Sequence, residues 1–389
     1  NAQQGMKKTY DFVVIGAGVF GAWIARSLHQ AGEEVALVDA YGPGNSRSSS
    51  GGETRVIRMG YGPDELYTRW AQQSLPLWEE LELQVDSELL HRTGVLWLSN
   101  DTDEYSRSML EVFRRSRVHY QQLDAAAIRQ RYPDLKFDDV TWGLLEPESG
   151  LLMARRAVRL LVFQLEKSGV PCTHAHILSP EGTGELHNIK TADGESISGG
   201  HFVFACGPWL PKVFPALLKD LIFPTRQEIF FLGPPAGDNS FRPPRMPVWL
   251  NHQHPHIPYA LPEIEGHGYK IAFDRHGPAI DPDSEERVVS TESIARLRAF
   301  LSKHVPRLAN SPILETRVCQ YENTWNGDFL IDRHPDFKNV WLVGGGSGHG
   351  FKHGPAIGAY MTDVVLRGAA PEKRFLLASK QTVQARAVY

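Results

Sequence analysis

The sequence predicts an α/β fold built on a parallel sheet and interrupted by a second, antiparallel sheet. Three observations lead to this prediction. A strand–helix–strand unit opens the chain, buried strands of the same kind return in the middle and near the end, and a stretch rich in proline, histidine and aromatic residues separates them. The chain has 389 residues, 42% hydrophobic and 22% charged, which is typical of a globular protein with two or three domains.

The opening unit contains the first predicted elements. Residues 10–16 form a short apolar, β-branched run typical of a buried parallel strand, and residues 34–39 form another. Between them apolar residues recur at helical spacing as far as Gly32, where the helix should end. The first turn carries the pattern GxGxxG, and the second strand ends in an acid. We therefore expect a dinucleotide-binding site that includes Gly16, Gly18, Gly21 and Asp39.

Each residue of this motif has a physical role. The first glycine permits the tight turn, the second lets the backbone approach a pyrophosphate, and the third allows close packing of helix and strand. The N-terminus of the helix offers free N–H groups and a partial positive charge to the phosphates. Asp39 can accept hydrogen bonds from a ribose diol. The motif alone does not distinguish FAD from NAD.

The later elements follow from the same periodicities. A helix over 63–83 contains Pro76, which should kink or split it. The segment 224–281 should form antiparallel strands, among them 227–232 and 269–273. The remaining predictions are strands at 94–99, 201–206 and 339–344, and helices at 104–117, 123–132, 155–168 and 355–366.

This order of elements implies a discontinuous, Rossmann-like nucleotide-binding domain into which a β-rich substrate domain is inserted twice. We assign residues 6–85, 150–222 and 318–389 to the nucleotide-binding domain. Residues 86–149 and 223–317 then form the substrate-binding, catalytic domain. Residues 1–5 are interpreted as a cloning remnant and are left out of the prediction.

Charge and cysteine content exclude several classes of protein. A net charge of -4 gives no basic footprint for nucleic acid or an anionic membrane surface. No apolar stretch is long enough for a spanning helix. Three cysteines, without CxxC spacing, give neither a disulfide framework nor a metal site, and the proline-interrupted histidines at 252, 254 and 256 are not expected to bind metal. A cytoplasmic location is the default expectation.

Two further glycine-rich loops are candidates for ligand binding. The loop 41–58 ends in Arg55 and Arg58, which would share a face if residues 54–58 opened a helix or turn, or would be solvated if the loop were merely flexible. The run 344–354 follows a buried strand and precedes a helix. Its backbone could form a second cradle of donors, with Gly346, Gly348 and Gly350.

Seven blocks in the same order along nearly the whole chain resemble the monomeric sarcosine oxidase family of amine oxidases. This family includes N-methyltryptophan and pipecolate oxidases and belongs to the D-amino-acid-oxidase-like flavoproteins. The blocks are 14–21, 52–58, 205–209, 269–272, 319–321, 329–335 and 347–352. The resemblance implies FAD as cofactor, a secondary amine or imino acid as substrate, O2 as acceptor, H2O2 as product and a monomeric enzyme.

The resemblance also implies roles for individual residues. Cys319 falls where family members attach FAD through an 8α-S-cysteinyl bond, and Lys270 matches the lysine that promotes reaction with oxygen. Arg58 and Lys352 match the pair that binds the substrate carboxylate. Further matches are Thr54 and Arg55 beside the flavin ring and Tyr259 and Tyr321 lining the substrate cavity.

Without the resemblance, these residues have simpler interpretations. Cys319 could be a buried free thiol, Lys270 and Lys352 could face solvent, and the two tyrosines could be core residues.

Two positions depart from the family pattern. Asp274 stands where relatives carry a histidine, and Gly51 stands where some carry another, before the block with Glu53. Asp274 could favour a substrate with a second cationic group, or could pair with Lys270 and alter the reaction with oxygen.

Three other functions remain open at the level of sequence. A flavin dehydrogenase of the same fold would pass electrons to a quinone or a carrier protein. An NAD-linked dehydrogenase is disfavoured by the block around Cys319. A nucleotide-binding sensor without turnover would have no evident use for Arg58, Lys270 and Lys352 together.

Overall fold

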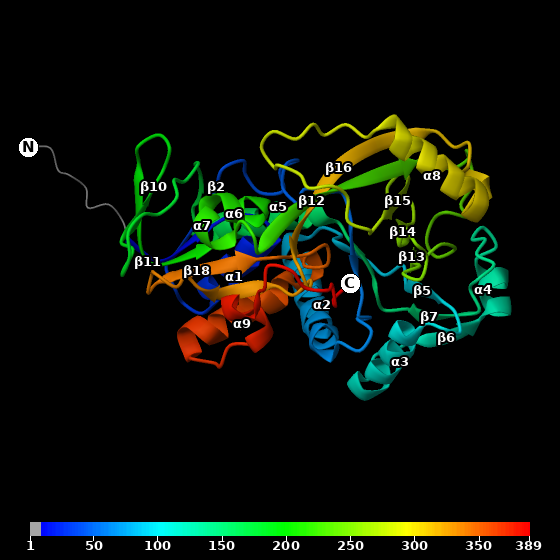
Figure 1. Cartoon of the computed structure of the whole chain (residues 1–389), viewed down its shortest axis with the longest axis horizontal. Helices are drawn as coiled ribbons and strands as arrows, with labels where there is room; N and C mark the ends of the chain where they lie inside the picture. The colour runs from blue at the N-terminus through cyan, green and yellow to red at the C-terminus, as the bar shows by residue number, and fades with distance from the viewer. Residues whose placement is uncertain (1–8) are drawn as a thin grey trace, which may run out of the picture.

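The computed structural model of the chain describes residues 9–389 and contains two large sheets (Figure 1). Residues 1–5, interpreted as a cloning remnant, lie outside the described part. The first large sheet has the strand order β17-β18-β11-β1-β2-β9, with β10 paired to β11. Strands β1, β2, β9, β11 and β18 run parallel to their neighbours in this order, and β17 is antiparallel to β18. The strands are β1 (Thr9–Ile15), β2 (Val35–Asp39), β9 (Cys172–His174), β10 (Asn188–Lys190), β11 (Ser196–Phe204), β17 (Leu330–Arg333) and β18 (Val340–Gly344).

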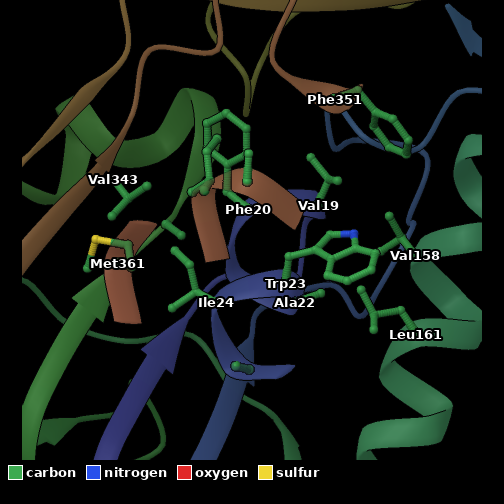
Figure 2. Packing of buried hydrophobic residues seen from close by; sticks show 14 of the residues in the cluster. Val19, Phe20, Ala22, Trp23, Ile24, Val158, Leu161, Val343, Phe351 and Met361 are labelled. Atoms are coloured by element: carbon green, nitrogen blue, oxygen red, sulfur yellow. The ribbon is translucent and has the colours of Figure 1, made fainter. Parts of the chain in front are cut away.

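Four long helices pack in the same half of the molecule: α1 (Val19–Gln30), α2 (Glu65–Val85), α5 (Ala154–Lys167) and α9 (Gly354–Arg367). Helices α1 and α9 touch directly, because Gly358 brings its backbone against that of Trp23; a Cβ at Gly358 would lie 2.5 Å from the Trp23 carbonyl oxygen. Figure 2 shows Trp23 facing Val158 and Leu161 of α5. These contacts hold the start of α1, and therefore the glycine turn before it, at the carboxyl end of strand β1.

The second large sheet is mostly antiparallel and has the order β16-β12-β15-β14-β13-β5-β7-β6. It combines strands from residues 95–146 with strands from residues 222–324, which confirms the predicted discontinuous fold with an inserted β-rich part. Its strands are β5 (Val95–Ser99), β6 (Gln121–Asp124), β7 (Trp142–Glu146), β12 (Ile222–Leu232), β13 (Val248–Leu250), β14 (Pro258–Leu261), β15 (Tyr269–Phe273) and β16 (Ile313–Thr324). The helices in this half are α3 (Glu104–Ser116), α4 (Ala125–Arg131) and α8 (Thr291–His304).

Short elements complete the chain. A three-stranded sheet, β3-β8-β4, contains β3 (Arg55–Ile57), β4 (Leu90–His91) and β8 (Gly150–Leu152). The short helices are η1 (Gly207–Trp209), α6 (Leu210–Val213), α7 (Pro215–Leu218), η2 (Pro306–Leu308), η3 (Phe351–His353), η4 (Lys373–Phe375) and η5 (Leu377–Ser379). Of the helices in the described chain, none is both long and apolar enough to cross a lipid bilayer. The domain boundaries stay a proposal, and the one at residue 318 falls inside β16.

Three local features differ from the expectations. Helix α2 continues through Pro76, so the predicted split is absent, because Trp70, Trp78 and Leu81 bury one face of it in the core and this packing offsets the lost hydrogen bond. The helix predicted from residue 123 starts only at Ala125, because Asp124 pairs within β6 and caps the helix by accepting from the N–H of Ala127 at 2.7 Å. Residues 55–57 form a strand, not a helix or turn.

Candidate functional site

Two adjoining cavities lie where the two large sheets meet. The larger, of about 370 Å³, follows the ends of β1, β2 and β11, and the smaller, of about 100 Å³, lies between the glycine-rich loop 344–350 and the antiparallel sheet. Residues from distant parts of the chain line both cavities: Arg55, Cys319, Tyr321, Gly348 and Phe351. The arrangement suits an elongated ligand in the larger cavity that presents one end to a small molecule in the other.

The turn between β1 and α1 has the geometry that its glycines predict. Gly16 has a φ of +107°, and a Cβ there would lie 2.1 Å from the carbonyl oxygen of Ala205. A Cβ at Gly21 would lie 1.8 Å from the Gly16 oxygen, so the helix packs directly on the strand. Gly18 lines the larger cavity, and its missing side chain leaves the backbone open to a ligand. The turn is therefore shaped to receive a phosphate at the N-terminus of α1.

Asp39 stabilises this turn through hydrogen bonds and leaves about one acceptor position of its carboxylate for a ligand. Its carboxylate accepts from the N–H groups of Ala17 at 2.7 Å and of Tyr41 and Gly42 at 2.8 Å each. A carboxylate offers about four acceptor positions, so about one remains for a ribose hydroxyl. Asp39 also lines the larger cavity, which is the placement that this role needs.

The second glycine loop forms the opposite wall of the larger cavity. Gly346, Gly348 and Gly350 all line it, beside Ser347 and Phe351. A Cβ at Gly348, where φ is +81°, would lie 2.6 Å from the ring of Tyr321, and a Cβ at Gly350 would lie 2.7 Å from the ring of Phe20. Glycine is therefore required at both positions for the loop to pack this close.

Cys319, Arg55, Thr54 and Lys270 meet at the junction of the two cavities. Arg55 donates to the sulfur of Cys319 at 3.3 Å and to the carbonyl oxygens of Ser49 and Thr54. Lys270 lies on β15, is 3% exposed, and donates to the carbonyl oxygen of Thr54 at 2.8 Å. The interpretation of Lys270 as a solvent-facing strand residue is therefore wrong. Burial, reinforced by the charge of Arg55, holds the pKa of this lysine well below its usual value.

Arg58 and Lys352 lie in the smaller cavity and are also buried. Arg58 donates to the backbone oxygens of Gly60 and of Tyr389, the latter at 2.7 Å. Lys352 donates to the hydroxyl of Tyr61 and to the carbonyl of His349, at 2.7 Å each. Among residues 9–389, neither side chain forms an ion pair with an Asp or Glu side chain. Burial, together with the charge of Arg58, lowers the pKa of Lys352 well below its usual value.

Arg55 and Arg58 both line the smaller cavity, but they do not share the face of a helix or turn, because the segment is a strand. They belong to strand β3 and its end, which pairs with β8, and the two guanidinium groups reach different partners. Arg55 serves the junction near Cys319, whereas Arg58 stacks on the rings of Tyr61 and Trp97, with 4.4 and 4.9 Å between its Cζ and the ring centroids.

Tyr259, Tyr321 and Asp274 line the smaller cavity on the side of the antiparallel sheet. Tyr321 donates to Asp274 at 2.7 Å, and burial raises the pKa of Tyr259 to about 12. Asp274 also lies 3.5 Å from the guanidinium of Arg386. The hypothesis that Asp274 pairs with Lys270 is wrong, because Lys270 points to Thr54 instead.

Several residues of this site were not found from the sequence. Tyr61 lies under Arg58 and accepts from Lys352, while Trp97, Arg386 and Tyr389 complete the wall of the smaller cavity. Tyr389 and Arg58 are 331 positions apart in the chain, so no local pattern could join them. Glu322, on β16, is buried against the larger cavity, and its Oε1 has no hydrogen-bond partner.

These residues fit FAD. Asp39 and the Gly16–Gly21 turn can hold the adenosine and diphosphate, and the junction at Arg55 and Cys319 can hold the flavin ring beside the smaller cavity. The orphaned oxygen of Glu322 and the open backbone of Gly18 both face the cavity between these ends, as expected where a polar ligand binds.

Comparisons with known proteins agree with this geometry. The DAO family model, described as FAD dependent oxidoreductase, matches residues 11–364. A monomeric sarcosine oxidase from Bacillus sp. strain B-0618 is 29% identical over 368 residues, covering 93% of this chain and 94% of that protein. An N-methyl-L-tryptophan oxidase from Citrobacter koseri is 29% identical over 380 residues, covering 93% and 96%. The crystal structure of an L-proline dehydrogenase from P. horikoshii has the same fold, with a TM-score of 0.81 and 22% identity, covering 96% of this chain and 98% of that one.

Proposed function

The chain belongs to the DAO family of FAD-dependent oxidoreductases, and from this premise we propose that it oxidises the C–N bond of a small secondary amino acid. The substrate would be an N-methyl or cyclic amino acid, the acceptor O2, and the products an imine and H2O2. One observation carries the proposal. Arg58 and Lys352 are buried basic side chains without an Asp or Glu ion-pair partner in the described chain, and they line the cavity that adjoins Cys319.

Electrostatics make these two side chains an anion site. A buried cation without a counter-ion is costly, and a substrate carboxylate that pairs with both would relieve this cost. Binding would also favour the ammonium form of Lys352, because a nearby negative charge raises a pKa that burial has lowered. Arg58 has a planar guanidinium that suits bidentate binding of a carboxylate.

The carboxylate would orient the rest of the substrate. With its anion on Arg58 and Lys352, the amine and the adjacent C–H would point toward the junction at Cys319, between the rings of Tyr259 and Tyr321. Bound FAD supplies the two-electron acceptor chemistry there. In the smaller cavity the cations Arg58, Lys352 and Arg386 outnumber Asp274, which favours the neutral form of the amine, so we assign no general base.

The size of the smaller cavity favours a small substrate. Its volume of about 100 Å³ is well below the roughly 300–1,000 Å³ of pockets that hold drug-sized ligands. The rings of Trp97, Tyr259 and Tyr389 line it. Sarcosine, proline or pipecolate should therefore fit better than an amino acid with an indole or sugar substituent.

A peroxide-coupled assay with matched amines tests the proposal. We expect H2O2 from sarcosine, L-proline or L-pipecolate, and little from N-methyl-L-tryptophan or from dimethylamine, which lacks the carboxylate. Absence of both H2O2 and dye reduction with every carboxylate-bearing amine would contradict the proposal. Dye reduction with poor oxygen consumption would instead identify a dehydrogenase, in which case the amine site stands and the acceptor is wrong.

We further propose that FAD is attached covalently through Cys319, whose sulfur lines both cavities and lies 3.3 Å from Arg55. In Cys319→Ala we expect the yellow colour to leave the protein on acid precipitation, whereas it should stay with the wild-type pellet. The spectrum of the washed pellet checks this. Cys206→Ala is the matched control, because that thiol also lines the larger cavity but should leave attachment unchanged. Colour released from the wild-type pellet would show that the attachment does not form.

Substitution of Asp274 and substitution of Arg386 should shift the substrate preference in opposite directions. In Asp274→Asn an unpaired Arg386 is left in the cavity, so the ratio of kcat/KM for an N-methyl amino acid with a second carboxylate to that for sarcosine should rise about fivefold. In Arg386→Gln an unpaired Asp274 should instead favour a substrate with a second ammonium group by a similar factor. Steady-state kinetics on both substrate types check this. Shifts of the same sign in both variants would show that the pair acts only on packing.

A further inference from the structure

Glu322 is a buried acid in the larger cavity that the proposed reaction does not use. Its residue is 6% exposed, and its Oε1 is buried without a hydrogen-bond partner. The N–H groups of Gly345 and Gly346 face the carboxyl and favour its ionised form, but no cation of residues 9–389 pairs with it. Burial outweighs these N–H groups and raises its pKa to about 7. A buried carboxyl oxygen without a hydrogen-bond partner, beside a cavity, is expected to bind a polar group of a ligand.

The local backbone is arranged around this carboxyl. A Cβ at Gly344 would lie 2.3 Å from Oε1 of Glu322, so a side chain at 344 would take the place of the carboxyl. The N–H of Ser347 donates to the backbone oxygen of Glu322 at 2.8 Å and ties the glycine loop to β16. The carboxyl is therefore held in one place by the same loop that forms the cavity wall.

Successive side chains of β16 point to opposite faces of the sheet and therefore form two sets. Cys319 and Tyr321 line both cavities, whereas Gln320 and Glu322 line only the larger one. Burial raises the pKa of the Cys206 thiol, and the charges of Asp39 and Glu322 add to this shift. Asp39, Cys206, Cys319 and Glu322 all line the larger cavity.

We propose that Glu322 is a FAD-binding residue whose Oε1 forms a hydrogen bond with a hydroxyl of the ribityl chain. The diphosphate is a poor partner because it would repel the ionised carboxyl, and Asp39 lines the cavity where the adenosine ribose is expected. Between the diphosphate and the flavin ring FAD carries only the ribityl polyol, whose hydroxyl groups can both donate to and accept from a carboxyl. The proposal depends on the cofactor of the family and not on the identity of the amine.

Cofactor binding in a Cys319→Ala background tests the proposal. In this variant FAD can bind only reversibly, whether or not Cys319 attaches it in the wild type. Addition of Glu322→Ala should raise the dissociation constant of FAD about tenfold. Glu322→Gln, which keeps the shape but not the acid, should raise it by about threefold. Flavin fluorescence during titration of the apoprotein gives both constants.

Fragments of the cofactor separate a ribityl contact from general damage. As competitors of FAD, riboflavin 5′-phosphate should bind more weakly to the Glu322 variants, whereas ADP, which lacks the ribityl chain, should bind as before. Glu315→Gln is the matched control, because it makes the same change at an exposed position of the same strand. An unchanged FAD constant, or an equal loss of ADP affinity, would overturn the proposal. Circular dichroism identifies a variant that fails to fold; if Glu322→Ala does, Glu322→Gln decides.

Discussion

Lys270→Met is expected to slow the reaction with O2 by roughly a hundredfold or more, while oxidation of the amine continues at nearly the wild-type rate. The buried amino group of Lys270 lies beside the junction, has no Asp or Glu partner within the described chain, and donates only to oxygen atoms of Thr54. The charge of its ammonium form stabilises negative charge that develops on oxygen, and low polarity around it strengthens the effect. Stopped-flow measurement of each half-reaction separates the two rates.

The pH dependence of the reaction with O2 gives a second, independent test of the role of Lys270. Because burial holds the pKa of Lys270 well below its usual value, the ammonium should lose its proton as pH rises through that lowered pKa. The oxygen rate of the wild type should therefore fall with rising pH, and that of Lys270→Met should stay flat. Lys303→Met, at an exposed position of α8, is the control and should behave as the wild type. An equal slowing of both half-reactions would point to a structural defect instead.

The sequence predicted the parts of the site that depend on local backbone geometry. Gly16 and Gly21 were identified because a turn with a positive φ and a helix in direct contact with a strand leave no room for a side chain, and this requirement is visible in a few consecutive letters. The same holds for the end of β2 at Asp39, where a short apolar run stops at an acid.

The parts that depend on distant pairing could not be predicted in this way. Residues 55–57 form a strand only because residues 150–152 lie beside them, so the helix or turn that would place Arg55 and Arg58 on one face does not form. Asp274 finds its partner Arg386 at a separation of 112 positions. Glu322 has no local signal at all, since its burial follows from the packing of β16 against the glycine loop.

Arg58→Met is expected to raise KM for a carboxylate-bearing amine on the order of a hundredfold to a thousandfold. Arg58 is 6% exposed, it stacks on Tyr61 and Trp97, and its only hydrogen-bond acceptors in the described chain are the backbone oxygens of Gly60 and Tyr389. A bound substrate carboxylate would replace or share the Tyr389 acceptor and would accept charge-assisted hydrogen bonds from the guanidinium. Methionine keeps the apolar contact with the two rings but removes the charge.

Comparing substrates with and without a carboxylate isolates this interaction from changes in packing. The slow turnover of dimethylamine should be nearly unaffected in Arg58→Met, because the lost partner is absent from that substrate, and Arg58→Lys should recover part of the affinity for sarcosine. Arg129→Met, at an exposed position of α4, should leave both substrates unchanged. A KM for sarcosine within about threefold of the wild type in Arg58→Met would mean that Lys352 alone carries the anion site, because a buried charge pair that is truncated costs far more than that.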